Sequence, residues 1–194
     1  MYTGPFVVTE STLAKSYIEN DKGERTPAVE AYFHKLKDDM DIETLSHYNP
    51  QYNARGQNGL IDGLRGSENW KTGGWQGFQA TDFTAVVDLR EVKEISLIGS
   101  GYCLDARSWI WMPRYVEYSV SEDGEHYKNV GKIKNDVDEQ DYNIQTKDFI
   151  LDLSQNPVKC RYVKVFAKNF GTIPSWHLGA GGEGFIFIDE IWVK

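Results

Sequence analysis

The chain is poor in cysteine and histidine and has no excess of basic residues, and these shortages exclude several classes of function. Its 194 residues include 2 Cys and 4 His, and 21 Lys and Arg stand against 29 Asp and Glu. The formal net charge of −8 argues against a nucleic-acid partner, because phosphate backbones are bound by basic stripes. The same charge argues against binding to anionic membrane surfaces.

Long apolar runs are also missing. No stretch approaches the roughly 20 residues that a membrane-spanning helix needs. Residues 1–5 lack the basic segment and apolar core that mark a secretory signal peptide. We therefore expect neither membrane insertion nor a signal peptide within this sequence.

The two cysteines, Cys103 and Cys160, allow one disulfide at most. Neither has a second Cys or a His at the spacing that zinc sites use. Two buried free thiols are favoured over a disulfide, which stays an alternative.

Catalytic motifs are absent as well. The sequence has no Gly-x-Ser-x-Gly elbow, metal-binding His pair, P-loop or dinucleotide fingerprint. Asp189 and Glu190 are neighbours on a predicted strand, so their side chains face opposite sides and cannot act as an acid–base pair. We expect no catalytic residue and infer an accessory module rather than an enzyme.

What the chain has in quantity is aromatic residues and short strands separated by polar turns. Aromatics make up 13% of the residues, with 6 Trp and 11 Tyr, which suits both strands and sugar-stacking surfaces. Such a series of strands predicts an all-β sandwich or jelly roll. The expected strands are 84–89, 94–99, 116–121, 149–153, 162–167 and 185–193, and the long loops are 46–82, 99–113 and 168–184.

The first 40 residues differ from the rest. A strand at 12–18, a polar turn at 20–24 and a second run at 28–33 predict a hairpin. Two strands alone are marginal in water, so this piece is expected either to pack on something else or to be part of a broken domain. The acidic stretch 37–41 predicts a linker. The expected division is a partial β-domain at 1–40 and a sandwich at 41–194.

A glycine-rich segment, Gly59 to Ser67, is the first chemically informative motif. Its carbonyls, with the side chains of Asp62 and Ser67, supply oxygens suited to a hard cation such as calcium. The same loop fits a turn in which Asp62 accepts hydrogen bonds from nearby backbone N–H groups. The residues alone favour the turn.

Leu-Ile-Asp-Gly at 60–63, followed by Ser67 and Trp70, resembles the opening signature of coagulation-factor-type C (discoidin) domains, which include the family 32 carbohydrate-binding modules. The closing segment 187–193 resembles the last strand of that family, which has a galactose-binding-like β-sandwich. In the family a calcium ion lies between these two segments. The resemblance therefore implies a structural Ca²⁺ held by Gly59, Asp62, Leu64, Ser67, Asp189 and Glu190.

Two longer strings, 70–78 and 174–182, resemble modules at the C-terminus of bacterial family 20 β-N-acetylhexosaminidases (chitobiases). Residues 2–5 and 11–17 resemble the second half of the small β-domain that precedes such modules. There is no room for the catalytic barrel, which needs about 250 residues. The resemblance implies a module of such a glycosidase, with the parent's catalytic domain as a partner and a periplasmic, cell-surface or secreted location.

A sugar site in this fold lies on loops at one end of the sandwich, and three loops each offer an indole beside a polar group. The candidate carbohydrate-binding residues are Trp75, Gln76, Arg107, Trp109, Trp176 and His177. Trp75 is favoured because its glycine neighbours suggest an exposed setting. One of Trp109 and Trp111 is expected to face the core.

Each candidate also has a structural interpretation. His177 fits a hydrogen-bonded structural histidine equally well, and Arg107 fits an ion pair with Asp105 or another surface carboxylate. Trp70 and Trp192 are expected to pack rather than bind.

The ligand expected from the resemblance is an N-acetylhexosamine or a galactose-type sugar. Some galactose-binding members pair an Arg with an Asn five residues later, where Met112 follows Arg107 in this chain. This departure argues against galactose, and the N-acetylhexosamine is favoured mainly by the resemblance to the family 20 parent enzyme. The alternative is a structural or interaction module that packs on the catalytic domain without binding sugar.

Overall fold

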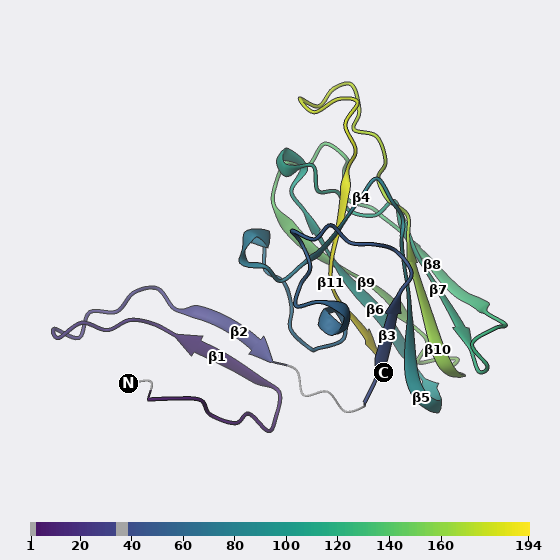
Figure 1. Ribbon diagram of the computed structural model, residues 1–194, viewed down its shortest axis with the longest axis horizontal. Coiled ribbons are helices and arrows are strands. Elements are labelled where there is room, and N and C mark those ends of the chain that lie inside the picture. Colours follow the sequence, from purple (N-terminus) through teal and green to yellow (C-terminus); the bar gives the residue numbers. More distant parts are fainter. Residues whose placement is uncertain (1–2, 34–38) are drawn as a thin grey trace.

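The computed structural model describes residues 3–33 and 39–194, which form a β-hairpin and a larger β-sandwich (Figure 1). Residues 37 and 38 of the predicted linker, and residue 2 of the N-terminal motif, lie outside these ranges. Within them, no helix is both long and apolar enough to cross a bilayer. The helical turns described are η1 (Gln57–Leu60), η2 (Trp70–Thr72) and η3 (Ala106–Ser108).

The hairpin pairs β1 (Thr12–Ser16) with β2 (Val29–Phe33) in antiparallel register. At its turn, the Asn20 side-chain carbonyl accepts hydrogen bonds from the N–H groups of Lys22 and Glu24, both at 3.0 Å. The predicted hairpin is confirmed. It lies beside the sandwich and reaches it through a backbone bridge between Phe33 and Leu64 (Figure 1).

The sandwich consists of two antiparallel sheets, so the predicted all-β class is confirmed. The five-stranded sheet has the order β3 (Asp41–Thr44), β5 (Phe83–Ile95), β10 (Val158–Ala167), β7 (Tyr115–Ser121) and β8 (Lys128–Lys134). The four-stranded sheet has the order β4 (Gln76–Gln79), β11 (Phe185–Val193), β6 (Leu97–Leu104) and β9 (Gln145–Asp152).

Alternating side chains from both sheets fill the space between them. On β5, Phe83, Ala85 and Val87 are fully buried while the residues between them are half-exposed, as expected for a strand with one buried face. Tyr118 of β7 reaches across the core and donates its hydroxyl to the Phe149 carbonyl of β9 at 2.6 Å. This core gives the loops at each end a rigid base.

Both cysteines are buried and free, and they lie in different sheets, Cys103 on β6 and Cys160 on β10. Burial raises the pKa of the Cys103 thiol to about 12 and that of Cys160 to about 11. The favoured prediction of two free thiols is therefore confirmed.

Candidate functional site

Three loops meet at one end of the sandwich: 105–114 between β6 and β7, 135–144 between β8 and β9, and 168–184 between β10 and β11 (Figure 1). They lie together because the strands that they connect are antiparallel, so that all three connections fall at the same end of the two sheets. We call this group of three loops the loop end, and the candidate site lies on it.

Arg107, Tyr142 and Trp176 come from the three different loops and form one cluster. The Arg107 guanidinium carbon lies 5.4 Å from the centre of the Tyr142 ring, and Arg107 Nη1 donates a 2.9 Å hydrogen bond to the Tyr142 carbonyl. The Trp176 and Tyr142 ring centroids are 6.4 Å apart, with their planes at 78°. Trp176 is 40% exposed, so its indole is open to a ligand.

Tyr142 was not anticipated from the sequence. It sits in a polar turn where Asp141 accepts hydrogen bonds from the backbone and side-chain N–H groups of Asn143, at 2.9 and 2.8 Å. These bonds, the backbone one first, hold the pKa of Asp141 below its usual value. The sequence signal that was available is this aspartate two residues before an asparagine, a common way to order a turn.

The structure gives His177 the hydrogen-bonded structural setting that was its alternative interpretation. Its side chain is only 6% exposed. The ring stacks on Tyr142 at 5.9 Å and 7°, and lies edge-on to Trp111 at 5.2 Å. Its Nδ1 accepts the Gly179 N–H at 2.9 Å. The histidine therefore shapes the loop that presents Trp176.

Trp109 and Trp111 divide as expected. Trp111 is buried and stacks on Phe170 at 4.6 Å, whereas Trp109 is 38% exposed. Trp109 ends η3 in the left-handed region, with φ of 67°, which is uncommon for a bulky residue. Its indole lies directly against Gly179 and Gly182, where an added Cβ would come within 2.5 and 3.1 Å of the ring. Trp109 is thus half-covered by the same loop that carries Trp176.

Asp105 anchors η3, which carries Arg107. One oxygen of the buried carboxylate, Oδ2, accepts the Trp70 indole N–H at 2.9 Å and the Ser108 hydroxyl at 2.7 Å. No ion pair joins Asp105 to Arg107 in the described residues, so the alternative partner suggested for Arg107 is not seen. Trp70, expected in the core, is half-buried and packs against Tyr52 in a second cluster.

Trp75 and Gln76 are both buried, at 1% and 0% exposure, so the exposed setting expected for Trp75 is wrong and neither side chain is open to a ligand here. The Trp75 indole N–H donates to the Ser67 carbonyl at 3.0 Å, and its ring lies flat against Gly66. The Gln76 amide donates to the Gly56 carbonyl at 2.7 Å. The glycines near Trp75 admit a closely packed ring instead of exposing it.

A small hollow adjoins the loop end. Its volume is about 130 Å³, and its lining includes Trp111, Arg114, Glu139 and Phe170. Pockets that enclose small ligands are usually about 300–1,000 Å³. The loop end therefore offers an open platform rather than a closed pocket.

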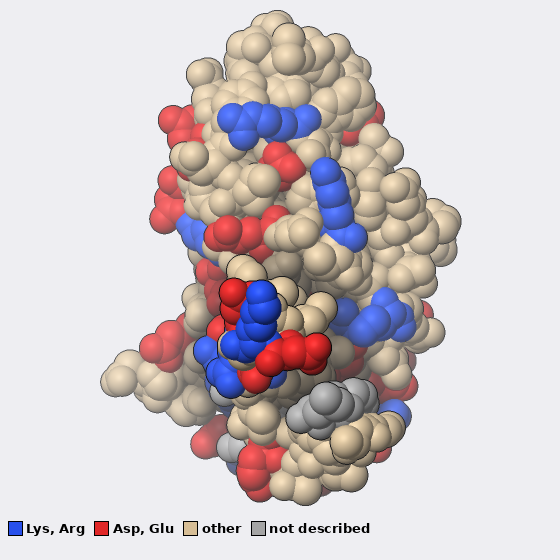
Figure 2. Space-filling view, turned by 90° about the vertical axis from the view of Figure 1, so that its left-hand side faces the viewer, with Lys and Arg blue, Asp and Glu red and all other residues tan. Residues whose placement is uncertain are grey.

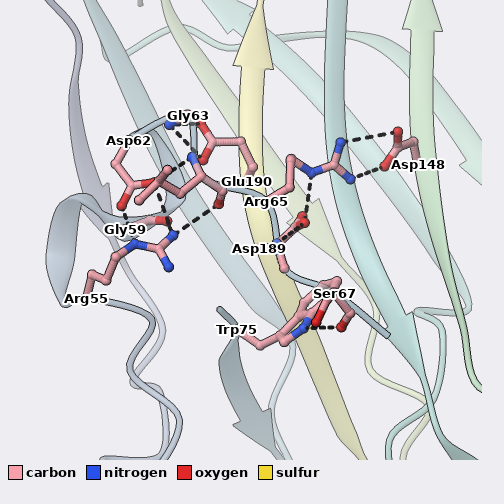
Figure 3. Close-up of polar contacts among 12 residues, drawn as sticks. Arg55, Gly59, Asp62, Gly63, Arg65, Ser67, Trp75, Asp148, Asp189 and Glu190 are labelled. Atoms are coloured by element: carbon pink, nitrogen blue, oxygen red, sulfur yellow. Dashed lines mark hydrogen bonds and ion pairs between the residues drawn. The ribbon is translucent and has the colours of Figure 1, made fainter. Parts of the chain in front are cut away.

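The residues expected to hold calcium lie away from the loop end, around η1 and β11 (Figure 3). Three of them are bound to Arg55, whose Nε donates to Asp62 Oδ2 at 2.5 Å. Its Nη2 donates to Asp62 Oδ1 at 3.1 Å, to the Leu64 carbonyl at 3.1 Å and to the Gly59 carbonyl at 3.3 Å. A guanidinium thus occupies the centre of this donor set.

The other three expected ligands bind different groups. The Glu190 carboxylate accepts the Gly63 N–H, at 3.1 and 3.2 Å from its two oxygens. The Asp189 carboxylate accepts bonds from Arg65 Nε at 2.8 Å and from the Gly66 N–H at 2.9 Å. Ser67 is exposed and lies apart from Arg55: its carbonyl accepts the Trp75 indole N–H, and its hydroxyl donates to the Asn69 carbonyl at 3.3 Å (Figure 3). In this arrangement the donor set does not fit a calcium ion.

Burial dominates the electrostatics of both strand carboxylates. It raises the pKa of the Glu190 carboxyl to about 8, against the opposing hydrogen bond from Gly63. It also raises the pKa of Asp189, an effect that Arg65 opposes. Arg65 pairs with Asp148 as well, at 2.5 Å, and its guanidinium lies 4.7 Å from the Trp192 ring. Trp192 therefore packs, as expected.

No family model and no curated protein matches the chain. Among solved structures it resembles CpGH89CBM32-6 produced by Clostridium perfringens, with 16% identity and a TM-score of 0.46 over 82% of this chain and 95% of that one. It also resembles CpGH89CBM32-5 from the same organism, in complex with GalNAc-β-1,3-galactose, with 21% identity and a TM-score of 0.45 over 79% and 94%.

A third similar structure is the Ruminococcus gnavus GH29 fucosidase E1_10125 in complex with fucose. It has 9% identity and a TM-score of 0.51, and the match covers 79% of this chain and 25% of that one. At such low identity the likeness concerns the fold. The chain therefore has the β-sandwich fold of one segment of that enzyme, and its structural neighbours include family 32 carbohydrate-binding modules.

Proposed function

We propose that this chain is a non-catalytic carbohydrate-binding module of a glycoside hydrolase, and that its sugar surface is the loop end. One observation carries the proposal. An open indole, Trp176, lies beside a tyrosine that holds an exposed arginine, Arg107, in place.

The chemistry of these side chains suits a sugar ring. The apolar face of a pyranose packs on an indole, which gives contact area at a small cost in conformational entropy. Arg107 donates one N–H to the Tyr142 carbonyl, and this bond orients the planar guanidinium. The remaining N–H groups of Arg107 are left as donors for sugar hydroxyl groups. Trp109, half-exposed against the same loop, extends the aromatic surface.

The surroundings support an uncharged ligand. In Figure 2 the outermost part of the loop end is free of charged side chains on the face in view. Segment 172–183, which forms the tip, carries one acidic side chain, Glu183, at its base. Neutral sugars are therefore favoured over strongly charged ligands at this surface.

The parent enzyme and the sugar form the finer part of the proposal. The string 174–182, which resembles family 20 β-N-acetylhexosaminidases, is the part of the chain that carries Trp176 and His177. This supports a terminal N-acetylhexosamine as the ligand, with a galactose-type sugar second. A parent of that kind acts outside the cytoplasm, which supports a periplasmic, cell-surface or secreted location.

The test is calorimetric titration of the protein with N-acetylglucosamine, N-acetylgalactosamine and galactose. We expect weak binding of at least one sugar and a loss of about tenfold or more in Trp176→Ala, the size expected for removing an aromatic anchor. Val92→Ala is the matched control, since Val92 is 50% exposed on β5, outside the loop end.

Absence of binding to all three sugars would contradict the proposal, as would equal affinity in the Trp176→Ala and Val92→Ala variants. Circular dichroism of each variant separates a lost contact from a lost fold. Arg107→Ala should weaken binding without lowering the melting temperature, because the Arg107 side chain is exposed.

The alternative, a module that packs on a catalytic domain, is supported by the apolar tip of the same loop. Leu178 is fully exposed, and Ile144, at the end of the 135–144 loop, is 42% exposed. Leu178→Asp distinguishes the two functions. It should leave sugar affinity within about twofold if the module binds sugars, and it should abolish co-sedimentation with a family 20 catalytic barrel if the tip is a docking surface.

A further inference from the structure

The loop 54–64 has an unusual backbone that directs Arg55 inward. Ala54, Arg55 and Gly56 have consecutive positive φ angles of 33°, 66° and 87°. Non-glycine residues rarely adopt this region, and such a conformation persists where other contacts enforce it. The turn is also tight, because a Cβ on Gly59 would come within 1.6 Å of the Ala54 carbonyl oxygen.

The result of this conformation is a guanidinium that bridges one carboxylate and two carbonyl oxygens. Nε and Nη2 of Arg55 form a fork that binds the two oxygens of the Asp62 carboxylate. Nη2 also donates to the carbonyl oxygens of Gly59 and Leu64. Charge-assisted bonds of this forked kind are stronger and more directional than neutral ones. Arg55 and Asp62 are about one-third and one-quarter exposed, which leaves their attraction only partly screened.

The loop that Arg55 organises is attached to the last strand by hydrogen bonds between protein groups. The Gly63 N–H binds the carboxylate of Glu190, 127 positions further along the chain. Beside it, Arg65 and the Gly66 N–H bind Asp189 (Figure 3). The junction between the first long loop and β11, which calcium is expected to stabilise in the related family, is thus already closed.

We propose that Arg55 is an internal cation that takes the place of calcium, so that this module holds its first loop against β11 without a metal ion. The guanidinium supplies positive charge to Asp62 and hydrogen bonds to the carbonyls of Gly59 and Leu64. A calcium ion and the guanidinium cannot occupy the same donor set. The calcium expectation and this arrangement therefore make opposite predictions.

The experiment compares thermal unfolding of the wild-type chain in excess EGTA and in excess calcium chloride, with calorimetric titration of calcium chloride as a direct measure of binding. We expect the same melting temperature in both solutions and no binding heat. A melting temperature that rises with calcium would overturn the proposal, because the ion would then displace Arg55. This comparison needs no variant, so it does not depend on a mutant that folds.

Arg55→Met tests the arginine itself, since it keeps an unbranched side chain and removes the charge and the donors. We expect its melting temperature in EGTA to fall by roughly 4–10 °C, the scale for losing several charge-assisted bonds in a domain of this size. Calcium chloride should restore part of that loss, because the freed oxygens of Asp62, Gly59 and Leu64 suit a hard cation.

Arg90→Met is the matched control. Arg90 is also an arginine at positive φ, 70°, but it makes one exposed 3.4 Å ion pair with Asp41. Its replacement should shift the melting temperature by less than about 2 °C, because exposed pairs contribute little. An Arg55→Met variant as stable as Arg90→Met would also overturn the proposal.

Discussion

At the scale of single residues, glycine decides where the indole of the first loop lies. An added Cβ on Gly66 would come within 2.2 Å of the Trp75 ring, and one on Gly74 within 2.9 Å of the Gly66 Cα. The ring therefore needs both glycines in order to reach its buried position. Once there, it donates to the Ser67 carbonyl and belongs to a small cluster with Cys103, Ile110 and Phe187.

Gly66→Ala should lower the free energy of unfolding by about 1–3 kcal/mol, because a rigid indole rather than a flexible chain end meets the new methyl group. Urea denaturation followed by tryptophan fluorescence measures the change. Ser67→Ala, at the exposed neighbouring position, is the control and should unfold close to the wild-type midpoint. Coincident midpoints for both variants would show that the loop relaxes around the methyl group.

The candidate site illustrates which residue roles can be predicted from sequence. Residues two apart in a strand share a face, so alternation alone would not separate Trp109 from Trp111. The positive φ of Trp109 turns that side chain outward, while Trp111 is buried. The expectation that Trp75 is exposed failed because the burial of its ring depends on a contact with Gly66, which no local sequence pattern encodes. Tyr142 was missed for the same reason, since its partners come from two other loops.

At the scale of elements, the pairing of β5 with β10 contains an irregularity that an ion pair stabilises. The register shifts between Cys160 and Tyr162, and the residue between them, Arg161, binds Asp88 through two bonds of 2.8 and 2.9 Å. The hydrogen bond from Arg161 is the largest cause that lowers the pKa of Asp88. The bulge thus aims a guanidinium at a carboxylate on the neighbouring strand.

This pair predicts a pH-dependent difference between the wild type and Asp88→Asn. A carboxyl whose pKa is lower in the folded protein adds stability above its unfolded pKa, about 3.9, and loses it as the pH falls through the folded value. Asp88→Asn should therefore unfold at a lower urea concentration at pH 7, and the gap should close below about pH 4. Because both side chains are partly exposed, the effect should be smaller than that of Gly66→Ala.

Glu94→Gln, at an exposed position of β5, controls for loss of one negative charge and should match the wild type across this range. A gap between the wild type and Asp88→Asn that is constant with pH would mean that packing, not the ion pair, explains the difference.

Strand prediction succeeded where alternation was long and failed where the partner strand defines the element. β11 was predicted with its observed bounds, and β7, β9 and β10 to within a few residues. The polar sequence of β4 has no strand signal, yet its pairing with β11 leaves three of its four residues buried. β3 and β8 were missed too, since edge strands need only one partner and tolerate polar side chains.

At the scale of the whole molecule, two parts of very different burial share one chain. The sandwich has a continuous core of residues from both sheets. The N-terminal part exposes apolar side chains instead, and Phe6, Val7, Ile18 and Val29 are 69–87% exposed. An isolated two-stranded hairpin is marginal in water. This supports the proposal that residues 1–40 are part of a small β-domain rather than part of the sandwich.

A chain starting at residue 39 should therefore keep the stability of the sandwich. The hairpin meets the sandwich at the Phe33–Leu64 bridge, and the described core contains none of its side chains. We expect a melting temperature within about 2 °C of the full chain, since a small loss of contact moves a domain of this size by no more than that. Differential scanning calorimetry measures it, and sugar affinity should be unchanged because the hairpin makes no part of the loop end (Figure 1).

The matched control is a chain starting at residue 46, which also loses β3. Ile42 of that strand is buried in the core, and its carbonyl accepts a 3.0 Å hydrogen bond from the Gln57 side chain. Removing it exposes the edge of β5 and opens a cavity, so this chain should melt at a clearly lower temperature than the one starting at residue 39. If the two truncated chains lose stability equally, the hairpin is an integral part of the sandwich, and the boundary near residue 40 is misplaced.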